Sequence, residues 1–332
     1  MLHKTLTELT GKVLADERLS FKETELLLEV PFHDLLYGAN RIRERYRGNK
    51  VTFCSIINAK SGRCSEDCRF CAQSGHYQTS AADFPLADEE AMVAGARSAI
   101  ENRAACYSLV TSGKSVCNET DWETLSRIIE TISREGRIDC CASLGELNPE
   151  KADRLRRAGL TRYHHNIETS ENFFPQICST HSFADKIKTI KTARKAGFAV
   201  CSGGIFGLGE SWEDRLSMAF TLRDLGVDSV PLNFLIPIKG TPMENNRRLS
   251  VEEILKVVAL FRFVLPEKDI KVSGGREKNL GDYQSWIFYA GANGFLIGNY
   301  LTTAGRAPEK DLRLAADMGF VPQTRNSGED ER

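Results

Sequence analysis

The chain has 332 residues, of which 41% are hydrophobic and 27% charged, and these values predict a soluble globular protein with a substantial core. Lysine and arginine (44 residues) nearly balance aspartate and glutamate (45 residues), which argues against a broad nucleic-acid-binding face. The sequence has no run of about 18 apolar residues and no apolar segment behind its basic N-terminal residues, so we expect a cytoplasmic protein without a membrane span.

Residues 1–45 have apolar side chains at helical spacing, for example at Leu6, Leu9 and Val13. This pattern predicts an N-terminal helical extension that forms a cap in front of the core. Residues 323–332 are polar and charged without an apolar anchor, and they are predicted to form a flexible tail.

Residues 46–322 alternate short apolar runs with amphipathic helical segments, the pattern of repeated strand–helix units around a parallel sheet. Eight strands are predicted, and that number favours an α/β fold of the TIM-type (β/α)8 barrel class. The predicted strands are 51–57, 106–111, 138–143, 162–168, 199–205, 229–235, 270–273 and 295–298. Helices predicted between them include 89–101, 122–134, 183–196 and 251–264.

Ten cysteines are more than packing requires, and a reducing compartment argues against structural disulfides, so the sequence favours metal ligation. Cys64, Cys68 and Cys71 follow the first predicted strand in the run CSEDCRFC. Three thiolates on one short loop can hold a cuboidal 4Fe-4S cluster and leave its fourth iron open to another ligand.

The Cys-x3-Cys-x2-Cys spacing is similar to that of radical S-adenosylmethionine (SAM) enzymes. This resemblance implies that the open iron binds SAM and that reductive cleavage releases a 5'-deoxyadenosyl radical, which abstracts hydrogen from an unactivated carbon. The alternative is a structural zinc site completed by His76 or by a remote cysteine.

Cys106, Cys141 and Cys201 lie on three different predicted strands. Because inward-facing residues of a barrel meet in layers, these three side chains can bind one cluster inside it. Arg276, at the end of the seventh predicted strand, is a candidate to complete the set. For each cysteine taken alone, the alternative is a small buried hydrophobic residue.

The runs CSEDCRFCAQS, CASLGEL, HHNIETS, VCSGGIFGLGES, PLNFLIPIKGTP and SGGRE resemble the motifs of the biotin synthase family, in the same order, from about residue 40 to residue 323. The resemblance implies that Cys106, Cys141, Cys201 and Arg276 hold an auxiliary 2Fe-2S cluster. It further implies that sulfur from this cluster is inserted into dethiobiotin to form biotin, the last step of biotin biosynthesis.

The same resemblance implies partners: a flavodoxin-type or ferredoxin-type electron donor, iron–sulfur assembly proteins that rebuild the auxiliary cluster, and a second copy of the chain in a homodimer. It also implies that Asn166 contacts substrate or SAM, that Glu168 accepts hydrogen bonds from the ribose of SAM, and that Asn233 binds the ureido ring of dethiobiotin.

Two positions depart from the family pattern. Cys54 stands on the first predicted strand in place of serine, so an extra thiolate could replace ligation by arginine or support an auxiliary cluster larger than 2Fe-2S. The alternative is that Cys54 is a packing residue. His164 stands in place of asparagine and shares a strand face with Asn166 and Glu168, so it is a candidate for contact with the substrate.

Other functions stay open from the sequence. One is a related radical SAM enzyme with another substrate, such as a maturase or a mutase. Another is a non-catalytic protein, either an iron–sulfur electron carrier or a binding protein held together by zinc.

Overall fold

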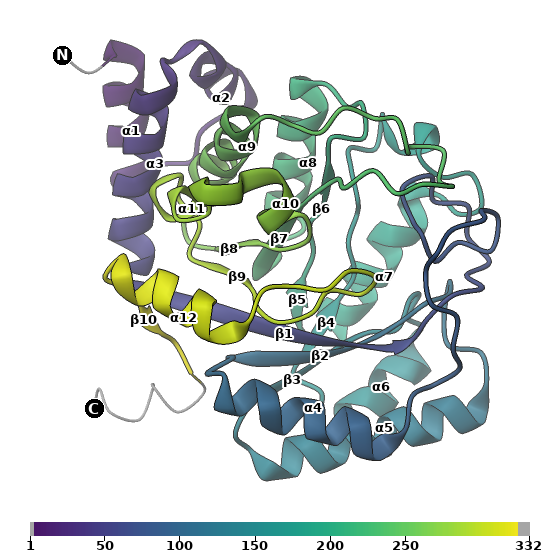
Figure 1. The fold of residues 1–332 in the computed structure, drawn as a ribbon. Helices are drawn as coiled ribbons and strands as arrows, with labels where there is room; N and C mark the ends of the chain where they lie inside the picture. Colours follow the sequence, from purple (N-terminus) through teal and green to yellow (C-terminus); the bar gives the residue numbers. More distant parts are fainter. Residues whose placement is uncertain (1–2, 325–332) are drawn as a thin grey trace.

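A closed barrel of parallel strands forms the centre of the molecule, and the computed structural model describes residues 3–324 of it (Figure 1). Strand β1 (Lys50–Lys60) pairs with β2 on one side and with β9 on the other, and this second pairing closes the barrel. The remaining barrel strands follow in chain order. They are β2 (Cys106–Thr111), β3 (Asp139–Ser143), β4 (Arg162–His164), β5 (Ala199–Cys201), β6 (Gly204–Phe206), β7 (Ser229–Phe234), β8 (Asp269–Val272) and β9 (Gly294–Leu296).

All eight predicted strands are present, and the predicted barrel class is confirmed. The fifth predicted strand is divided into β5 and β6, because the backbone of Gly203 between them bonds to the segment after β4: its carbonyl accepts from the amides of Ile167 and Glu168. The same bonds end β4 at His164, four residues before the predicted end. The division therefore arises from one contact between two neighbouring strand ends.

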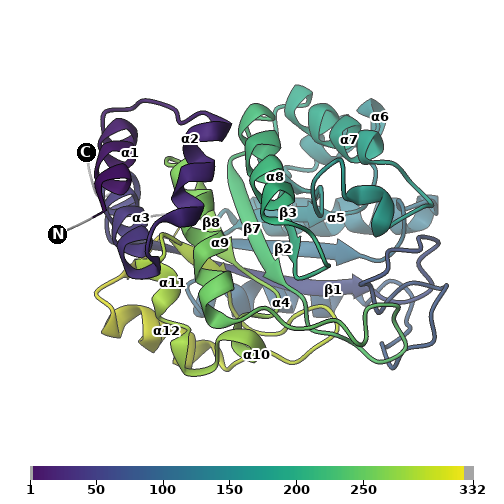
Figure 2. The same cartoon turned by 90° about the horizontal axis from the view of Figure 1, so that it is seen from above.

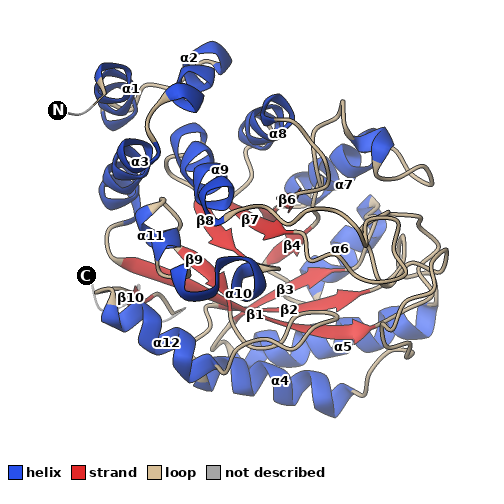
Figure 3. Cartoon of the chain, turned by 45° about the horizontal axis from the view of Figure 1, so that its top comes forward, coloured by secondary structure: helices blue, strands red, loops and turns tan. Residues whose placement is uncertain are grey.

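Helices cover the outside of the barrel, so the red strands of Figure 3 are surrounded by blue helices. Three of these helices begin with a capping box, in which a serine and the acidic residue three positions later each bond to the other's backbone amide. The helices after β1 are α4 (Glu89–Glu101), α5 (Glu119–Glu135), α6 (Pro149–Arg157), α7 (Phe183–Lys195), α8 (Trp212–Asp224), α9 (Val251–Val264), α10 (Arg276–Leu280), α11 (Trp286–Tyr289) and α12 (Pro308–Asp317), with short 3-10 turns η2 (Phe174–Gln176) and η3 (Gly281–Tyr283).

The N-terminal helices pack beside the barrel on α8 and α9. They are α1 (Lys4–Leu14), α2 (Phe21–Leu26), the 3-10 turn η1 (Leu27–Glu29) and α3 (Phe32–Arg47). Figure 2 shows them at the opposite end of the molecule from the loops that follow β1. The helical character of this region agrees with the sequence pattern, and the proposed domain boundary after residue 45 falls inside α3.

Side chains alternate along the barrel strands between the helices and the interior. On β2, Tyr107 points outward and its hydroxyl donates to the carbonyl of Met92 on α4 at 3.0 Å, whereas Cys106 and Ser108 face the interior cavity. Outward positions of this kind build a core with almost no solvent exposure between sheet and helices. The interior cavity is lined by cysteines and polar residues together with apolar side chains such as Ile56, Val110 and Ile205.

The last described residues return to the start of β1. Strand β10 (Val321–Pro322) pairs in parallel with Lys50 and Val51, and the amide of Gln323 donates to the carbonyl of Val51 at 2.8 Å. Most of the predicted flexible tail, residues 325–332, lies outside the described residues. Within residues 3–324, no helix is both long enough and apolar enough to cross a membrane.

Candidate active site

A cavity of about 450 Å³ opens at the carboxyl ends of the barrel strands, the end where barrel enzymes place their active sites. It joins the cysteine loop after β1 to the cysteines of the barrel interior, so all the predicted site residues except Arg276 lie along one space. These lining residues are Cys54, Cys64, Cys68, Cys71, Cys106, Cys141, His164, Asn166, Glu168, Cys201 and Asn233.

The loop that carries Cys64, Cys68 and Cys71 is held in a compact form by its own backbone. The amide of Cys64 donates to the carbonyl of Gln73 at 3.1 Å, and the carbonyl of Cys64 accepts from the amide of Gly75 at 2.8 Å. The amide of Cys71 donates to the carbonyl of Cys68 at 2.9 Å. All three thiols are free and face the cavity, as a cluster with three protein ligands requires.

A second segment, residues 176–181 between β4 and α7, anchors this loop. The carboxylate of Asp67 accepts from the amides of Ser179 and Thr180 at 2.9 and 3.2 Å, and the amide of Arg69 donates to the carbonyl of Ile177 at 2.9 Å. Burial alone would raise the pKa of Asp67, but the hydrogen bonds from Ser179, Cys178 and Thr180 outweigh burial and hold that pKa below its usual range. The anchor therefore depends on the charged form of Asp67.

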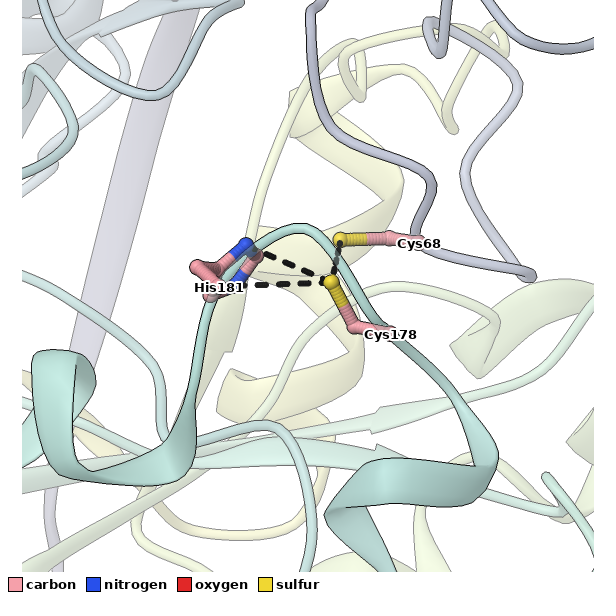
Figure 4. Close-up of side chains that lie close together, drawn as sticks. All are labelled: Cys68, Cys178 and His181. Atoms are coloured by element: carbon pink, nitrogen blue, oxygen red, sulfur yellow. Dashed lines mark hydrogen bonds between the residues drawn. The ribbon is translucent and has the colours of Figure 1, made fainter.

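Cys178 and His181 belong to the same anchoring segment and approach Cys68 (Figure 4). The Sγ atoms of Cys68 and Cys178 are 3.7 Å apart, and Cys178 Sγ lies 3.3 Å from His181 Nδ1. Cys178 is buried at the edge of the core, and its thiol also lies within a polar cluster beside the cavity residue Cys68. His76, the sequence candidate for completing a zinc site, instead places Nε2 2.9 Å from the carbonyl oxygen of Ser65.

The barrel cysteines meet because of strand register. Cys54 on β1 stands level with Cys106 on β2, and their Sγ atoms are 2.9 Å apart. Cys141 on β3 and Cys201 on β5, the two strands that flank β4, line the same cavity. The extra cysteine at position 54 is therefore a member of a four-thiol set, and Cys140 packs into the core on the other side of β3.

Two basic side chains that the sequence analysis missed lie among these thiols. Lys271 Nζ on β8 is 3.1 Å from Cys54 Sγ, and Arg162 on β4 is a cavity residue whose Nε and Nη1 are buried without a hydrogen-bond partner within residues 3–324. Burial alone would lower the pKa of Lys271, but attraction to Cys54 and Cys106 outweighs burial and raises it. A lysine between isoleucine and valine in a predicted barrel strand was the signal that could have identified this position.

The thiols themselves are crowded. The hydrogen bond with Cys106, followed by burial, raises the pKa of Cys54 well above its usual range, and the hydrogen bond with Cys141 raises the pKa of Cys106 to about 12. Four thiols in one buried space therefore resist ionising together unless positive charge compensates them. Lys271, Arg162 and bound iron are the groups that can supply it.

Arg276 is not a member of this set, which corrects the prediction that it completes the auxiliary ligands. Its guanidinium is fully buried away from the cavity lining, where Nη2 is 2.7 Å from Asp311 Oδ2 and Nη1 donates to Gln284 at 2.6 Å. It also lies over the ring of Phe295. Arg276 lies five positions after Lys271, and the chain turns into α10 between them, so the two side chains face different surroundings.

The end of β4 and the segment that follows it direct three polar side chains toward the cavity. His164 Nε2 lies 3.0 Å from Asn166 Oδ1, and Asn166 Nδ2 donates to Glu168 Oε2 at 3.4 Å. Burial lowers the pKa of His164 to about 4, so its ring is neutral at pH 7, and burial raises the pKa of Glu168. Glu168 has φ of +70°, a conformation that is costly for a residue other than glycine and that clusters at functional sites.

Asn233 on β7 lines the cavity while its amide bonds to backbone. Its Nδ2 donates to the carbonyl of Gly204 at 3.0 Å, and its Oδ1 accepts from the amide of Gly274 at 2.8 Å. Gly204 itself is required by close approach, because a Cβ there would lie 2.2 Å from the carbonyl oxygen of Glu168. The amide of Asn233 therefore fixes the glycine-rich wall and keeps one further proton and one lone pair for a ligand.

Two family models match the chain. The model of the radical SAM superfamily matches residues 59–222, which include the cysteine triplet, and the model of the Biotin and Thiamin Synthesis associated domain matches residues 231–321.

Curated relatives match nearly the whole chain. The biotin synthase of Geotalea daltonii is 51% identical over 310 residues, which cover 93% of this chain and 93% of the relative. The biotin synthase of Citrifermentans bemidjiense is 48% identical over 322 residues, which cover 96% of this chain and 98% of the relative.

Solved structures with low sequence identity share the fold. A methylornithine synthase superposes with a TM-score of 0.81 at 19% identity, covering 97% of this chain and 99% of that chain. A maturase of the FeFe-hydrogenase superposes with a TM-score of 0.82 at 16% identity, covering 96% of this chain and 75% of that chain. At these identities the likeness supports the barrel fold alone.

Proposed function

The chain belongs to the biotin synthase family of radical SAM enzymes, and from this membership we propose how its own side chains support the insertion of sulfur into dethiobiotin. The family makes the chain a sulfur-inserting transferase. The substrate is dethiobiotin and the product biotin, in the last step of biotin biosynthesis. One observation supports this reaction above the others: a single cavity contains a three-thiol loop and a separate four-thiol set with polar side chains between them.

The loop thiols of Cys64, Cys68 and Cys71 hold the 4Fe-4S cluster to which SAM binds. When bound, the cluster and SAM supply a 5'-deoxyadenosyl radical. The contribution of the chain is to place the three thiols on one face, to leave the fourth position open, and to enclose the space beyond it within the barrel mouth.

The polar residues after β4 bind and orient the organic ligands. Glu168 accepts hydrogen bonds from the ribose hydroxyls of SAM, and Asn166, which bridges His164 and Glu168, lies at the boundary between SAM and substrate. His164 is neutral at pH 7 and so contacts the substrate through hydrogen bonds rather than through charge. Asn233 uses its remaining proton and lone pair for the ureido ring.

The barrel thiols of Cys54, Cys106, Cys141 and Cys201 hold the auxiliary cluster that supplies the sulfur atom. Four thiolates complete the coordination of a 2Fe-2S cluster or of a 4Fe-4S cluster without an arginine ligand. The two cations fit this assignment: Lys271 donates to Cys54, and sulfide or thiolate in the cavity would supply acceptors for the buried unpaired donors of Arg162.

Family membership also supports the remaining partners. A flavodoxin-type or ferredoxin-type protein supplies electrons, iron–sulfur assembly proteins rebuild the auxiliary cluster, and the chain works as a homodimer in the cytoplasm. Ten free cysteines, nine of them at least partly buried, fit a reducing compartment of this kind.

The test is anaerobic reconstitution with iron and sulfide, then reduction in the presence of SAM and dethiobiotin, with mass spectrometry of biotin and 5'-deoxyadenosine. We expect both products. A Cys117→Ser variant is the matched control, because this thiol is exposed and lies outside the cavity. Deoxyadenosine without biotin would retain the radical chemistry and reject the substrate, as for a maturase or a mutase, and neither product would favour an electron carrier or a zinc protein.

A further inference from the structure

Cys178 and His181 are absent from both cluster ligand sets, yet their ligand atoms converge with Cys68 at one point (Figure 4). One ligand atom from each of the three residues lies within 4.8 Å of the other two. Cys178 Sγ stands between its neighbours, 3.7 Å from Cys68 Sγ and 3.3 and 3.8 Å from Nδ1 and Nε2 of His181. The group comes from two loops that are more than a hundred residues apart in the sequence.

These separations match the edges of a tetrahedral metal site. Metal–sulfur bonds of about 2.3 Å and metal–nitrogen bonds of about 2.0 Å at tetrahedral angles give sulfur–sulfur edges of about 3.8 Å and sulfur–nitrogen edges of about 3.5 Å. The 3.7 Å between the sulfurs of Cys68 and Cys178 and the 3.8 Å from Cys178 Sγ to His181 Nε2 agree with these two edges to within a few tenths of an ångström. The third pair, Cys68 Sγ and a ring nitrogen of His181, lies within 4.8 Å. Within the described residues the group has three members, so a water molecule would take the fourth position.

The neighbours of His181 also orient its ring in the way that is usual for a metal-bound histidine. Glu66 Oε2 lies 2.5 Å from His181 Nδ1 and accepts from the hydroxyl of Thr180 at 2.8 Å, and the side chains of both Glu66 and His181 are less than a tenth exposed. A carboxylate on Nδ1 fixes the tautomer that presents Nε2 to a metal. This pairing is the usual outer partner of a metal-bound histidine.

We propose that Cys68, Cys178 and His181 bind one divalent transition-metal cation of the zinc type in the chain that lacks the 4Fe-4S cluster, with Glu66 orienting the histidine. Two thiolates and an imidazole select Zn²⁺ or Fe²⁺ over Mg²⁺ and Ca²⁺, which prefer oxygen ligands. At equal availability Zn²⁺ binds such a site more tightly than Fe²⁺.

This site goes beyond the proposed function but shares one atom with it. Cys68 cannot be a terminal ligand of the cluster and of a separate cation at the same time. The loop therefore has two exclusive occupants, a single cation or a cluster, and a zinc-loaded chain resists cluster assembly until the zinc leaves.

Residue-resolved alkylation tests the binding. The cluster-free full-length chain is titrated with up to three equivalents of Zn²⁺ under reducing conditions, pulsed with N-ethylmaleimide, and its cysteine peptides are quantified by mass spectrometry. We expect zinc to slow the alkylation of Cys68 and Cys178 at least about tenfold and to leave exposed Cys117 unchanged.

Two variants make this result specific. His181→Gln removes the nitrogen ligand, and Cys178→Ala removes a thiolate but leaves the His181–Glu66 pair intact. Each variant should weaken the protection of Cys68, and His181→Gln should restore the alkylation of Cys178. Protection of Cys64, Cys68 and Cys71 together with an unprotected Cys178 would place zinc on the triplet alone and overturn the proposal, and so would no protection of Cys178 at any zinc level.

Cluster assembly provides the second readout. In the native cluster-free chain, preloading with one equivalent of Zn²⁺ should slow the appearance of iron–sulfur absorption at least about fivefold. In His181→Gln the same preload should slow it much less. Each protein is compared with its own zinc-free sample. Preloading with Fe²⁺ should cause no delay, because iron at this site is also a component of the cluster. Equal slowing by zinc in both proteins would contradict the site. None of these readouts involves biotin or SAM, so a failure of the zinc site can be distinguished from a failure of the proposed function.

Discussion

The two cysteine sets of the cavity are positioned by different kinds of structure. Cys64, Cys68 and Cys71 lie on one loop, which its own backbone hydrogen bonds keep compact and which residues 176–181 anchor. The barrel thiols, Cys54 among them, come from four strands and are fixed by the ladder of a closed sheet. Cysteines that are close in sequence on a loop therefore need added contacts to be held in place, whereas cysteines far apart in sequence on one barrel are held by the barrel itself.

Removing one thiol from each set gives the largest expected effect and separates the two roles. Cys68→Ser should reduce deoxyadenosine formation at least about a thousandfold, because the radical-forming cluster loses one of three ligands. Cys141→Ser should retain deoxyadenosine formation within about tenfold and reduce biotin at least about a hundredfold. Both products are measured by mass spectrometry after anaerobic reconstitution.

An equal loss of deoxyadenosine in both variants would contradict two separate roles, since the two cysteine sets would then form one cofactor site. Iron and sulfide content per folded chain is the companion measurement. It shows whether each variant lost a single cluster or failed to assemble any.

Arg276→Gln tests whether this arginine stabilises the fold or ligates the auxiliary cluster together with the barrel thiols. Breaking its buried ion pair with Asp311 leaves an uncompensated charge, so we expect the free energy of unfolding to fall by about 3 kcal/mol in urea titrations of the cluster-free chain. The iron content of the folded fraction should stay unchanged. Loss of auxiliary iron without loss of stability would return Arg276 to the ligand set.

Lys271 tests the charge balance of the barrel set. Lys271→Gln removes the ammonium that donates to Cys54 and should reduce biotin formation about tenfold, because a charge-assisted hydrogen bond to a buried group contributes about 1.5–3 kcal/mol. Lys271→Arg keeps the charge and should recover most of the activity. Deoxyadenosine formation serves as the internal control, and a parallel fall in both products would mean that Lys271 acts on the whole cavity.

The smallest expected effect concerns the hydrogen bonds by which Asp67 anchors the cysteine loop to Ser179 and Thr180. The pKa of Asp67 lies below its usual value, so its hydrogen bonds stabilise the anchor fully above about pH 4 and lose that stabilisation as the pH falls through the lowered pKa. Asp67→Asn should lower the hydrogen-exchange protection of the Ser179 and Thr180 amides about fivefold at pH 6.

The difference between native chain and variant should then shrink toward pH 3, after correction for intrinsic exchange rates. Amides of β2 in the barrel are the matched reference and should show no difference at either pH. A difference that stays constant from pH 6 to pH 3 would show that the anchor does not depend on the charge of Asp67.

Spacing along the chain predicted the loop set and the barrel, because both depend on local patterns. The triplet spacing identified Cys64, Cys68 and Cys71, and apolar alternation located all eight barrel strands. Strand alternation is also the reason why Cys141 faces the cavity whereas its neighbour Cys140 packs in the core.

Register and loop packing could not be predicted in this way. The position of Lys271 within an apolar strand singles it out, but the sequence alone does not show that Lys271 reaches Cys54 whereas Arg276, five residues later, binds Asp311. The approach of Cys178 to Cys68 depends on how two loops fold over each other, and the sequence holds no periodic signal for that contact. The missed residues are those whose positions depend on three-dimensional neighbours.

The pairing of β1 with β9 has a consequence for the order in which the protein can form. Thr52 and Phe53 find their partners Gly294 and Phe295 only after most of the chain has left the ribosome, because these pairs are separated by more than two hundred residues. During synthesis the half-built sheet has two open edges, and its cysteines remain reachable from solvent. The cysteine-lined interior is therefore enclosed late in folding, when the three-residue strand β9 pairs with β1.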